Sequence, residues 1–386
     1  MKDKILILPD SFKGSLSATE VGHAMAAGVQ RALAEVSKPF AVQVYPAADG
    51  GEGTAEALCA ALRGQTGTIP TVDPFLAPMD GTYARLSADT AVFDMATCCG
   101  LGLARQHGLD PLRASTYGVG KMIGGLIDRG FRRILVGLGG SGTNDGGIGA
   151  LSALGARFTD ANGAILDANL GGQVLSAISD IDLSAVQERL CGIELVLLYD
   201  VAVPLTGEVG ATKMFGRQKG ATDADIDRLE AGMLQYAACI RKRYGAVPDA
   251  DGAGAAGGLG CGLHLAGHLA GGKLCHGASY VLDTLGIPAL LGETALVFTG
   301  EGKTDAQTAK GKLPCTVARY AKAAGVPCID ICGQAEPVDA LYACGMTRIV
   351  PLVQNGITPE MAMAHTAALL EETAYRQVQL WLKEQA

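Results

Sequence analysis

The sequence predicts an α/β fold of two domains: a discontinuous Rossmann-like parallel sheet flanked by helices, and a smaller mixed α/β domain. Short, continuously apolar segments alternate with amphipathic helical segments, as in a parallel sheet covered on both faces. The 386 residues exceed one ordinary hydrophobic core. The 54 glycines follow no repeat, which indicates many tight loops.

Six short apolar segments read as the strands of the Rossmann-like domain. They lie at residues 4–8, 40–45, 134–136, 295–299, 328–332 and 348–353. Helices are expected between them. Ser17 and Glu20 have capping-box spacing, which predicts that the first helix begins here. This helix carries an apolar stripe at Val21, Met25 and Val29.

A hairpin is predicted from residues 82–86 and 91–95, which departs from the alternation of strands and helices. We therefore place a domain crossing near residue 76. The predicted Rossmann-like domain comprises residues 1–75, 117–155 and 285–386, and the second α/β domain comprises residues 76–116 and 156–284. The cleft between the domains is expected to hold the site.

The segment from Arg133 to Gly149 is the first candidate for ligand binding. An apolar strand leads into a loop of small residues, and a helical pattern follows. This order predicts a concave row of free backbone N–H groups at a helix N-terminus, which suits a phosphate. The loop residues concerned are Gly139, Gly140, Ser141, Gly142, Thr143 and Asn144. Asp145, in the same loop, is a candidate Mg²⁺ ligand.

Two strings imitate known nucleotide-binding fingerprints. Residues 137–142 satisfy G-x-G-x-x-G, and Asp160 follows at the spacing of a ribose-binding acid. The next candidate strand, at residues 156–159, is short and polar, which disfavours a dinucleotide-dependent dehydrogenase. Residues 302–304 read Gly-Lys-Thr, but Val297 stands where a P-loop needs its first glycine.

Four further loops carry Asp, Glu or Lys, most of them beside glycines and after predicted strands. They lie at Asp10–Lys13, Asp49–Glu52, Asp200 and Glu301–Asp305. Open α/β sheets bind ligands at the carboxyl ends of their strands. Carboxylates bind metal or accept a hydroxyl proton, and lysines neutralise phosphate oxygens. The sequence therefore predicts a kinase for a small hydroxylated molecule.

Charge and the N-terminal sequence limit the partners. The net charge of −8 argues against nucleic acid and against an anionic membrane surface. The apolar run at residues 5–8 is too short for a signal peptide, so a cytoplasmic protein is expected. A homo-oligomer is compatible with the sequence.

Six strings along the chain resemble the type 1 glycerate kinase family, in the family's order and over essentially the whole chain. They lie at residues 9–17, 48–54, 139–147, 218–221, 254–260 and 299–302. The resemblance implies ATP-dependent phosphorylation of D-glycerate, typically to 2-phosphoglycerate, in glyoxylate, glycerate or sugar-acid catabolism. It also implies a two-domain α/β fold unrelated to P-loop kinases.

On this basis we expect ATP and Mg²⁺ as cofactors. The glycine loop and Lys13 would cradle phosphates, and Asp200 or Asp305 would accept the proton of the substrate hydroxyl. The expected metal ligands are Asp49, Glu52 and Asp145. The remaining residues expected to bind ATP or glycerate are Asp10, Ser11, Lys219, Glu301, Lys303 and Lys312.

The sequence leaves three alternatives open. They are a kinase for another small hydroxy acid, a dinucleotide-binding oxidoreductase, and a binding protein without turnover. Thermal stabilisation by NAD would favour the oxidoreductase, and stabilisation by Mg·ATP would favour a kinase. Ligand stabilisation without ADP release would identify a binding protein.

Overall fold

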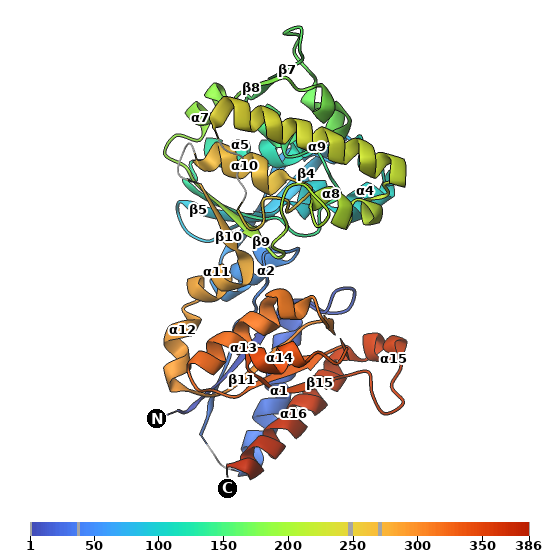
Figure 1. Ribbon diagram of the computed structural model, residues 1–386. Coiled ribbons are helices and arrows are strands. Elements are labelled where there is room, and N and C mark those ends of the chain that lie inside the picture. The colour runs from blue at the N-terminus through green and yellow to red at the C-terminus, as the bar shows by residue number, and fades with distance from the viewer. Residues whose placement is uncertain (1, 37–38, 246–249, 269–271, 386) are drawn as a thin grey trace. The chain divides into compact units, whose positions relative to one another are not determined.

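The computed structural model describes residues 2–36, 39–245, 250–268 and 272–385. The chain divides into two compact units (Figure 1). Unit 1 comprises Met1–Asp49, Glu56–Arg63 and Ala278–Ala386, and unit 2 comprises Gly50–Ala55 and Gly64–Gly277. Each unit has a central sheet of its own.

Unit 1 contains a five-stranded sheet in the order β15-β13-β11-β1-β2, and every neighbouring pair is parallel. Its strands are β1 (Lys4–Pro9), β2 (Ala41–Val44), β11 (Thr294–Gly300), β13 (Cys328–Cys332) and β15 (Met346–Pro351). Five of the six strands predicted for the Rossmann-like domain lie in this sheet, and the sixth is a strand of unit 2. Their continuous apolar character follows from burial on both faces of the sheet.

Helices cover both faces of this sheet. The helices of unit 1 are α1 (Ala18–Val36), α2 (Thr54–Ala61), α11 (Gly277–Thr284), α12 (Ile287–Leu290), α13 (Leu313–Ala323), α14 (Asp339–Cys344), α15 (Pro359–Ala364) and α16 (Thr366–Glu384). The first residues of α2 and the first residue of α11 belong to unit 2. α1 and α16 share one apolar cluster with alternate strand residues such as Ile5, Ile7 and Phe298. α13 lies against β11 and β13. The predicted capping box at the start of α1 is confirmed, because Glu20 Oε2 accepts the Ser17 N–H at 2.8 Å.

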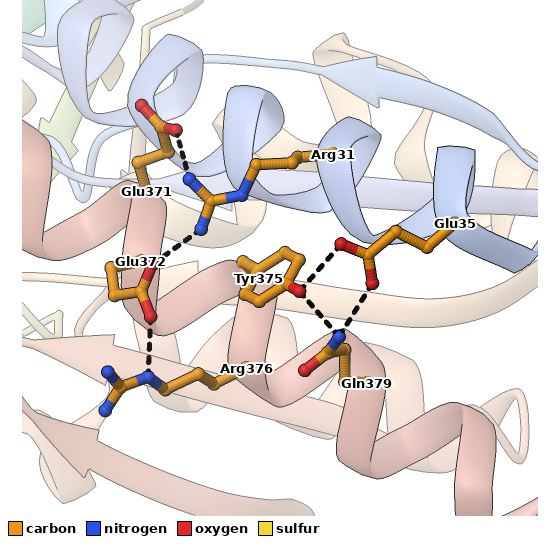
Figure 2. A network of polar contacts seen from close by, with 7 residues as sticks. All are labelled: Arg31, Glu35, Glu371, Glu372, Tyr375, Arg376 and Gln379. Carbon is orange, nitrogen blue, oxygen red and sulfur yellow. Dashed lines mark hydrogen bonds and ion pairs between the residues drawn. The ribbon is translucent and has the colours of Figure 1, made fainter.

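α1 and α16 lie side by side at close range. A Cβ atom added to Gly28 would lie 1.9 Å from the carbonyl oxygen of Glu371, so only glycine permits this approach. Figure 2 shows the polar contacts along the seam. The Arg31 guanidinium donates to Glu371 and Glu372 and lies 4.1 Å from the Tyr375 ring centroid. These contacts lie on the exposed side of the α1–α16 seam, above the shared apolar cluster.

Unit 2 contains a six-stranded mixed sheet in the order β10-β9-β6-β5-β4-β3. Its strands are β3 (Gln65–Val72), β4 (Pro78–Arg85), β5 (Thr90–Asp94), β6 (Arg133–Gly137), β9 (Glu194–Tyr199) and β10 (Lys273–His276). β3, β4 and β5 pair antiparallel, which confirms the predicted hairpin. β5, β6, β9 and β10 are parallel.

The helices of unit 2 enclose one large apolar core. They are α3 (Ala96–Cys99), α4 (Leu101–Gln106), α5 (Tyr117–Asp128), α6 (Ile148–Ala153), α7 (Ser184–Arg189), α8 (Ala211–Phe215), α9 (Asp223–Tyr244) and α10 (Leu259–His268), with a small antiparallel pair, β7 (Arg157–Thr159) and β8 (Asp180–Asp182). Thr222 and Asp225 form a capping box before α9. Among the described residues, no helix is both long enough and apolar enough to cross a bilayer.

The structure corrects the predicted division of the chain. Residues 117–155 were expected in the Rossmann-like domain, but β6 pairs with β5 and β9 and belongs to unit 2. Residues 64–75 also belong to unit 2, because β3 pairs with β4. The mixed unit, predicted to be the smaller, is therefore the larger. Sequence periodicity identified these strands but did not show which sheet each one joins.

Candidate active site

The strand order of unit 1 defines a topological switch point. The chain passes from β1 to β2 on one side of the sheet, and later from β11 through β13 to β15 on the other side. Consecutive connections therefore diverge between β1 and β11, and in open α/β sheets a ligand binds at the carboxyl ends of two such strands. The loops that leave these ends contain Asp10–Lys13 and Glu301–Asp305.

A pocket of about 400 Å³ opens at this switch point, which is a volume typical of small-molecule sites. All eight residues of unit 1 that the sequence singles out line it. They are Asp10, Ser11, Lys13, Asp49, Glu301, Lys303, Asp305 and Lys312. The structure thus brings together residues that are up to about three hundred positions apart.

Carboxylates crowd the charged part of this pocket. Burial raises the pKa of Asp10 well above its usual range, and the charges of Asp49 and Glu301 raise it further. Burial also raises the pKa of Glu301 to about 7, while Lys312 and a hydrogen bond from Thr308 oppose this shift. The Thr308 hydroxyl donates to Glu301 Oε1 at 2.5 Å. The pocket therefore favours a cation or a proton among these groups.

Lysines balance this negative charge. Lys312 Nζ lies 3.5 Å from Glu301 Oε2. Lys303 Nζ lies 2.6 Å from Glu336 Oε1 and 3.7 Å from Asp305 Oδ2. Burial lowers the pKa of Lys312, but the charges of Glu301, Asp49 and Asp305 outweigh it, so the net shift is upward. Lys312 is therefore a cation inside the pocket.

Magnesium fits the donor set at Asp10 and Asp49 better than at Glu301. Mg²⁺ is usually held by one or two carboxylates together with substrate phosphates. The mutual repulsion that raises the pKa of Asp10 would be relieved by a divalent cation. Glu301 already pairs with Lys312 and Thr308. Across the described part of the chain, no three His, Cys, Asp or Glu side chains are grouped to hold a metal on their own.

Unit 2 carries the glycine loop between β6 and α6. Gly140, Gly146 and Gly147 have positive φ angles. A Cβ added to Gly139 would lie 2.4 Å from Gly51 Cα and 3.2 Å from Asp200 Oδ2. Close approach of two backbone segments therefore requires glycine here.

Two carboxylates flank the accessible part of this loop. Asp200 lies beside Gly139, and Glu52 lies beside Gly140, where an added Cβ would be 3.3 Å from Glu52 Oε2. Gly140 is exposed, whereas residues 141–147 are all buried. Gly139 is buried as well, so Gly140 is the one exposed residue of segment 139–147.

The predicted row of free N–H groups in this loop is largely occupied. The N–H groups of Gly139, Gly142 and Gly146 donate to backbone carbonyls. Those of Gly147 and Gly149 donate to the Asp145 carboxylate at 3.0 and 3.3 Å. The protein's own carboxylate thus occupies the helix N-terminus that was predicted to bind phosphate.

Asp145 was predicted to bind metal, but its carboxylate is hydrogen-bonded inside unit 2. The carboxylate is fully buried, and its Oδ2 also accepts the N–H and the hydroxyl of Thr116, each at 2.8 Å. Four donors therefore occupy its oxygens. Burial raises the pKa of Asp145, and these hydrogen bonds oppose the shift. Asp145 acts as an internal brace of the loop.

Lys219 was expected to clamp phosphate, but it lies inside unit 2 with 2% of its surface exposed. Its ammonium donates to Ser141 Oγ at 2.8 Å and to the Thr143 carbonyl at 2.7 Å. Burial lowers the pKa of Lys219 to about 7, and the charge of Asp145 opposes this shift. Ser141, Thr143 and Lys219 therefore support the loop from within.

Asn144 also turns inward. Its side-chain N–H donates to Thr212 Oγ1 at 3.0 Å, and the residue is fully buried. Direct contact of Asn144 with a phosphate, as predicted, does not fit this position. The buried side of the loop is instead part of the packing of unit 2.

Two features, one in each unit, are not among the predicted site residues. Asp94 accepts the N–H groups of Gly53 and Ala55 at 2.8 and 3.1 Å, which fixes the segment that carries Glu52. Its position at the end of a predicted strand was a usable signal. The apolar wall of the unit 1 pocket, which includes Val353 and Met363, gave no signal because such residues read as core.

Both units have α/β architecture, and the carboxylates and lysines at their strand ends are residue types that phosphoryl transfer uses. A family model described as the glycerate kinase family matches residues 5–382. The chain belongs to the glycerate kinase family and is a kinase.

Similar proteins match over nearly their full length. A glycerate kinase of Bacillus subtilis (strain 168) is 38% identical over 376 residues, which is 96% of each chain. A glycerate 2-kinase of Escherichia coli (strain K12) is 38% identical over 356 residues, or 91% of each chain. The crystal structure of a Salmonella typhimurium LT2 protein assigned as glycerate kinase 2 has a TM-score of 0.83, with 36% identity and complete coverage of both chains.

Proposed function

We propose that this chain transfers the γ-phosphoryl group of ATP to D-glycerate and forms 2-phosphoglycerate. The observation that carries the proposal is the switch-point pocket of unit 1, in which Lys13, Lys303 and Lys312 lie among four carboxylates. Phosphoryl transfer needs cations on the phosphate oxygens and a carboxylate for metal or for the acceptor hydroxyl. Family membership supplies the substrate class, and the name of the Escherichia coli relative supports the 2-position.

Within this proposal the unit 1 pocket holds the phosphates of ATP. Lys13 and Lys312 would neutralise their oxygens, and Ser11 would donate to one of them. Asp10 and Asp49 would hold Mg²⁺, which would contribute further neutralisation of phosphate charge when bound. Glu301 would keep Lys312 in place through the ion pair. Lys303 lies at the edge of the pocket, where it also pairs with Glu336.

The acceptor hydroxyl needs a group that takes its proton. We propose Asp200 or Asp305 for this role. Asp305 lies in the unit 1 pocket near Lys303, whereas Asp200 lies at the carboxyl end of β9 beside the glycine loop. Glu52, the other carboxylate at that loop, is proposed to contact metal or substrate. Asp145 and Lys219 are assigned to supporting the loop.

An assay of ADP release with D-glycerate, followed by NMR of the product, tests the proposal. We expect ADP release that depends on D-glycerate and Mg²⁺, and a phosphate on the second carbon. ADP release with a different hydroxy acid but not with D-glycerate would favour the other kinase considered above. A phosphate on the third carbon would support glycerate kinase activity but refute 2-phosphoglycerate as the product.

A further inference from the structure

The unit 1 pocket has two chemically different halves. The loops after β1 and β11 contribute the charged half described above. The segment after β15, together with α15, contributes Leu352, Val353, Pro359, Ala362 and Met363. These five residues form the apolar wall of the pocket. The two halves are parts of one continuous cavity.

D-glycerate does not explain the apolar wall. It carries a carboxylate and two hydroxyl groups, and an apolar surface offers no partner to either. Met363 is 55% exposed, so its side chain leaves apolar surface in contact with water at the pocket. Covering such surface with an apolar group is favourable. The pocket is therefore suited to a ligand that is apolar at one end and anionic at the other.

The apolar wall is tied to the charged loop of Lys13. The Ser15 hydroxyl lies 2.6 Å from Thr366 Oγ1 and 3.3 Å from the carbonyl oxygen of Met363. Thr366 Oγ1 in turn donates to the carbonyl oxygen of Ala362 at 2.7 Å. A Cβ added to Gly14 would lie 3.5 Å from Met363 Cε. The thioether therefore lies next to the loop that carries the phosphate-binding lysine.

We propose that the apolar wall binds the adenine ring of ATP, so that the triphosphate extends toward Lys13 and Lys312. Adenine offers two apolar faces, and a methionine thioether makes favourable contacts with aromatic rings. The inference rests on the proposed function, which makes ATP the phosphate donor. It adds a subsite for the nucleoside and makes Met363 a residue that selects nucleotides over bare polyphosphates.

The test compares two methionines of the same short helix. Met363 lines the pocket, whereas Met361 is similarly exposed, at 50%, and does not line it. The variants Met363→Asp and Met361→Asp are titrated calorimetrically with ADP and with inorganic tripolyphosphate in the presence of Mg²⁺. Thermal denaturation of both variants checks that they fold.

We expect Met363→Asp to weaken ADP binding about tenfold, since one apolar contact is lost. Tripolyphosphate binding should weaken by a smaller factor, because the new carboxylate repels both ligands but only ADP loses the apolar contact, and Met361→Asp should change neither ligand. Unchanged ADP binding in Met363→Asp would overturn the proposal. An equal loss for tripolyphosphate would also overturn it, because the effect would then be electrostatic, and so would the absence of ADP binding to the wild type.

These titrations do not depend on glycerate turnover. If D-glycerate is not phosphorylated while Met363→Asp still weakens ADP selectively, the proposed function fails and the nucleoside subsite stands. If D-glycerate is phosphorylated while Met363→Asp binds ADP normally, the subsite fails and the proposed function stands. The two hypotheses therefore have separate readouts.

Discussion

Lys312 Nζ lies 3.5 Å from Glu301 Oε2 in the switch-point pocket, where Glu301 is buried and Lys312 is partly exposed. Burial raises the pKa of Glu301 to about 7 despite the opposing charge of Lys312. Protonation of Glu301 removes the negative charge that pairs with Lys312. We therefore expect kcat/KM for ATP to fall as the pH drops through about 7.

Glu301→Gln tests the origin of this acidic limb. The variant cannot ionise at residue 301, so its lower activity should no longer change near pH 7 in pH-rate measurements. Glu336→Gln is the control, because Glu336 pairs with Lys303 and is largely exposed. It should retain the limb. A limb of unchanged position in Glu301→Gln would assign it to another group.

Asp330 should make the protein less stable as the pH rises. It is fully buried in β13, where burial raises its pKa to about 7 and a hydrogen bond from Thr304 opposes the shift. The folded state then binds the proton more tightly than the unfolded state, so the unfolding free energy declines between about pH 4 and pH 7. The test is the difference in unfolding free energy between Asp330→Asn and wild type, measured by urea denaturation. This difference should favour Asp330→Asn more at pH 8 than at pH 5. Equal differences at both pH values would contradict this.

Asp145→Asn should destabilise unit 2 by about 1–3 kcal/mol, because an amide cannot accept all four hydrogen bonds that the carboxylate accepts. Chemical denaturation measures the loss. Asp160→Asn is the matched control: Asp160 accepts two backbone N–H groups in an exposed turn. A loss in the control as large as in Asp145→Asn would show that burial of the acceptor is not the cause.

Lys219 should give the stability of the protein a pH dependence opposite to that caused by Asp330. Its pKa falls to about 7 in the folded state, so the unfolded state binds the proton more tightly and stability rises with pH between about 7 and 10. Lys219→Met removes this contribution. The stability of wild type relative to Lys219→Met should therefore increase from pH 7 to pH 9.5 in urea titrations. Parallel curves would mean that Lys219 stays fully charged inside unit 2.

Gly139→Ala should impair the glycine loop, since the added Cβ would lie 2.4 Å from Gly51 Cα. We expect kcat to fall at least about tenfold, because the backbone beside Glu52 and Asp200 has to shift. Gly102→Ala is the control, as nothing lies within 4 Å of its added Cβ. Turnover in Gly139→Ala equal to that of the control would remove the loop from the reaction.

The sequence predicted the unit 1 site better than the unit 2 site. Strand ends can be located from short apolar runs, and parallel strands place their carboxyl ends at one edge. Charged residues that follow β1 and β11, such as Asp10 and Glu301, were therefore expected to meet, and they do. Strand pairing could not be predicted in the same way. The sequence of β6 has the same apolar character as the strands of unit 1, but β6 pairs with β5 and β9 in unit 2.

The glycine loop shows what a linear motif cannot reveal. Its composition predicted donors free for phosphate, yet tertiary contacts determine which donors remain. Asp145 occupies the N–H groups of Gly147 and Gly149, and Lys219 is buried beneath the loop. Both residues resemble ligand-binding groups in sequence because a polar brace uses the same chemistry as a binding site.

Single substitutions of the two candidate bases separate their roles. Asp200→Asn and Asp305→Asn are compared. The substitution that removes the group accepting the hydroxyl proton should lower kcat by about 10²–10⁴-fold, with a smaller change in the KM for D-glycerate. Steady-state kinetics of both variants measures this. Near wild-type turnover in both would exclude either residue as the base.

The central claim, that the switch-point pocket holds the phosphates of ATP during glycerate phosphorylation, is tested most directly with Lys13→Met. ADP release from Mg·ATP is measured with D-glycerate for the wild type and for this variant. We predict that the wild type releases ADP in step with 2-phosphoglycerate, and that the variant loses about 100-fold or more in kcat/KM for ATP. Equal rates for the two proteins, or ADP release without a phosphorylated glycerate, would contradict the account.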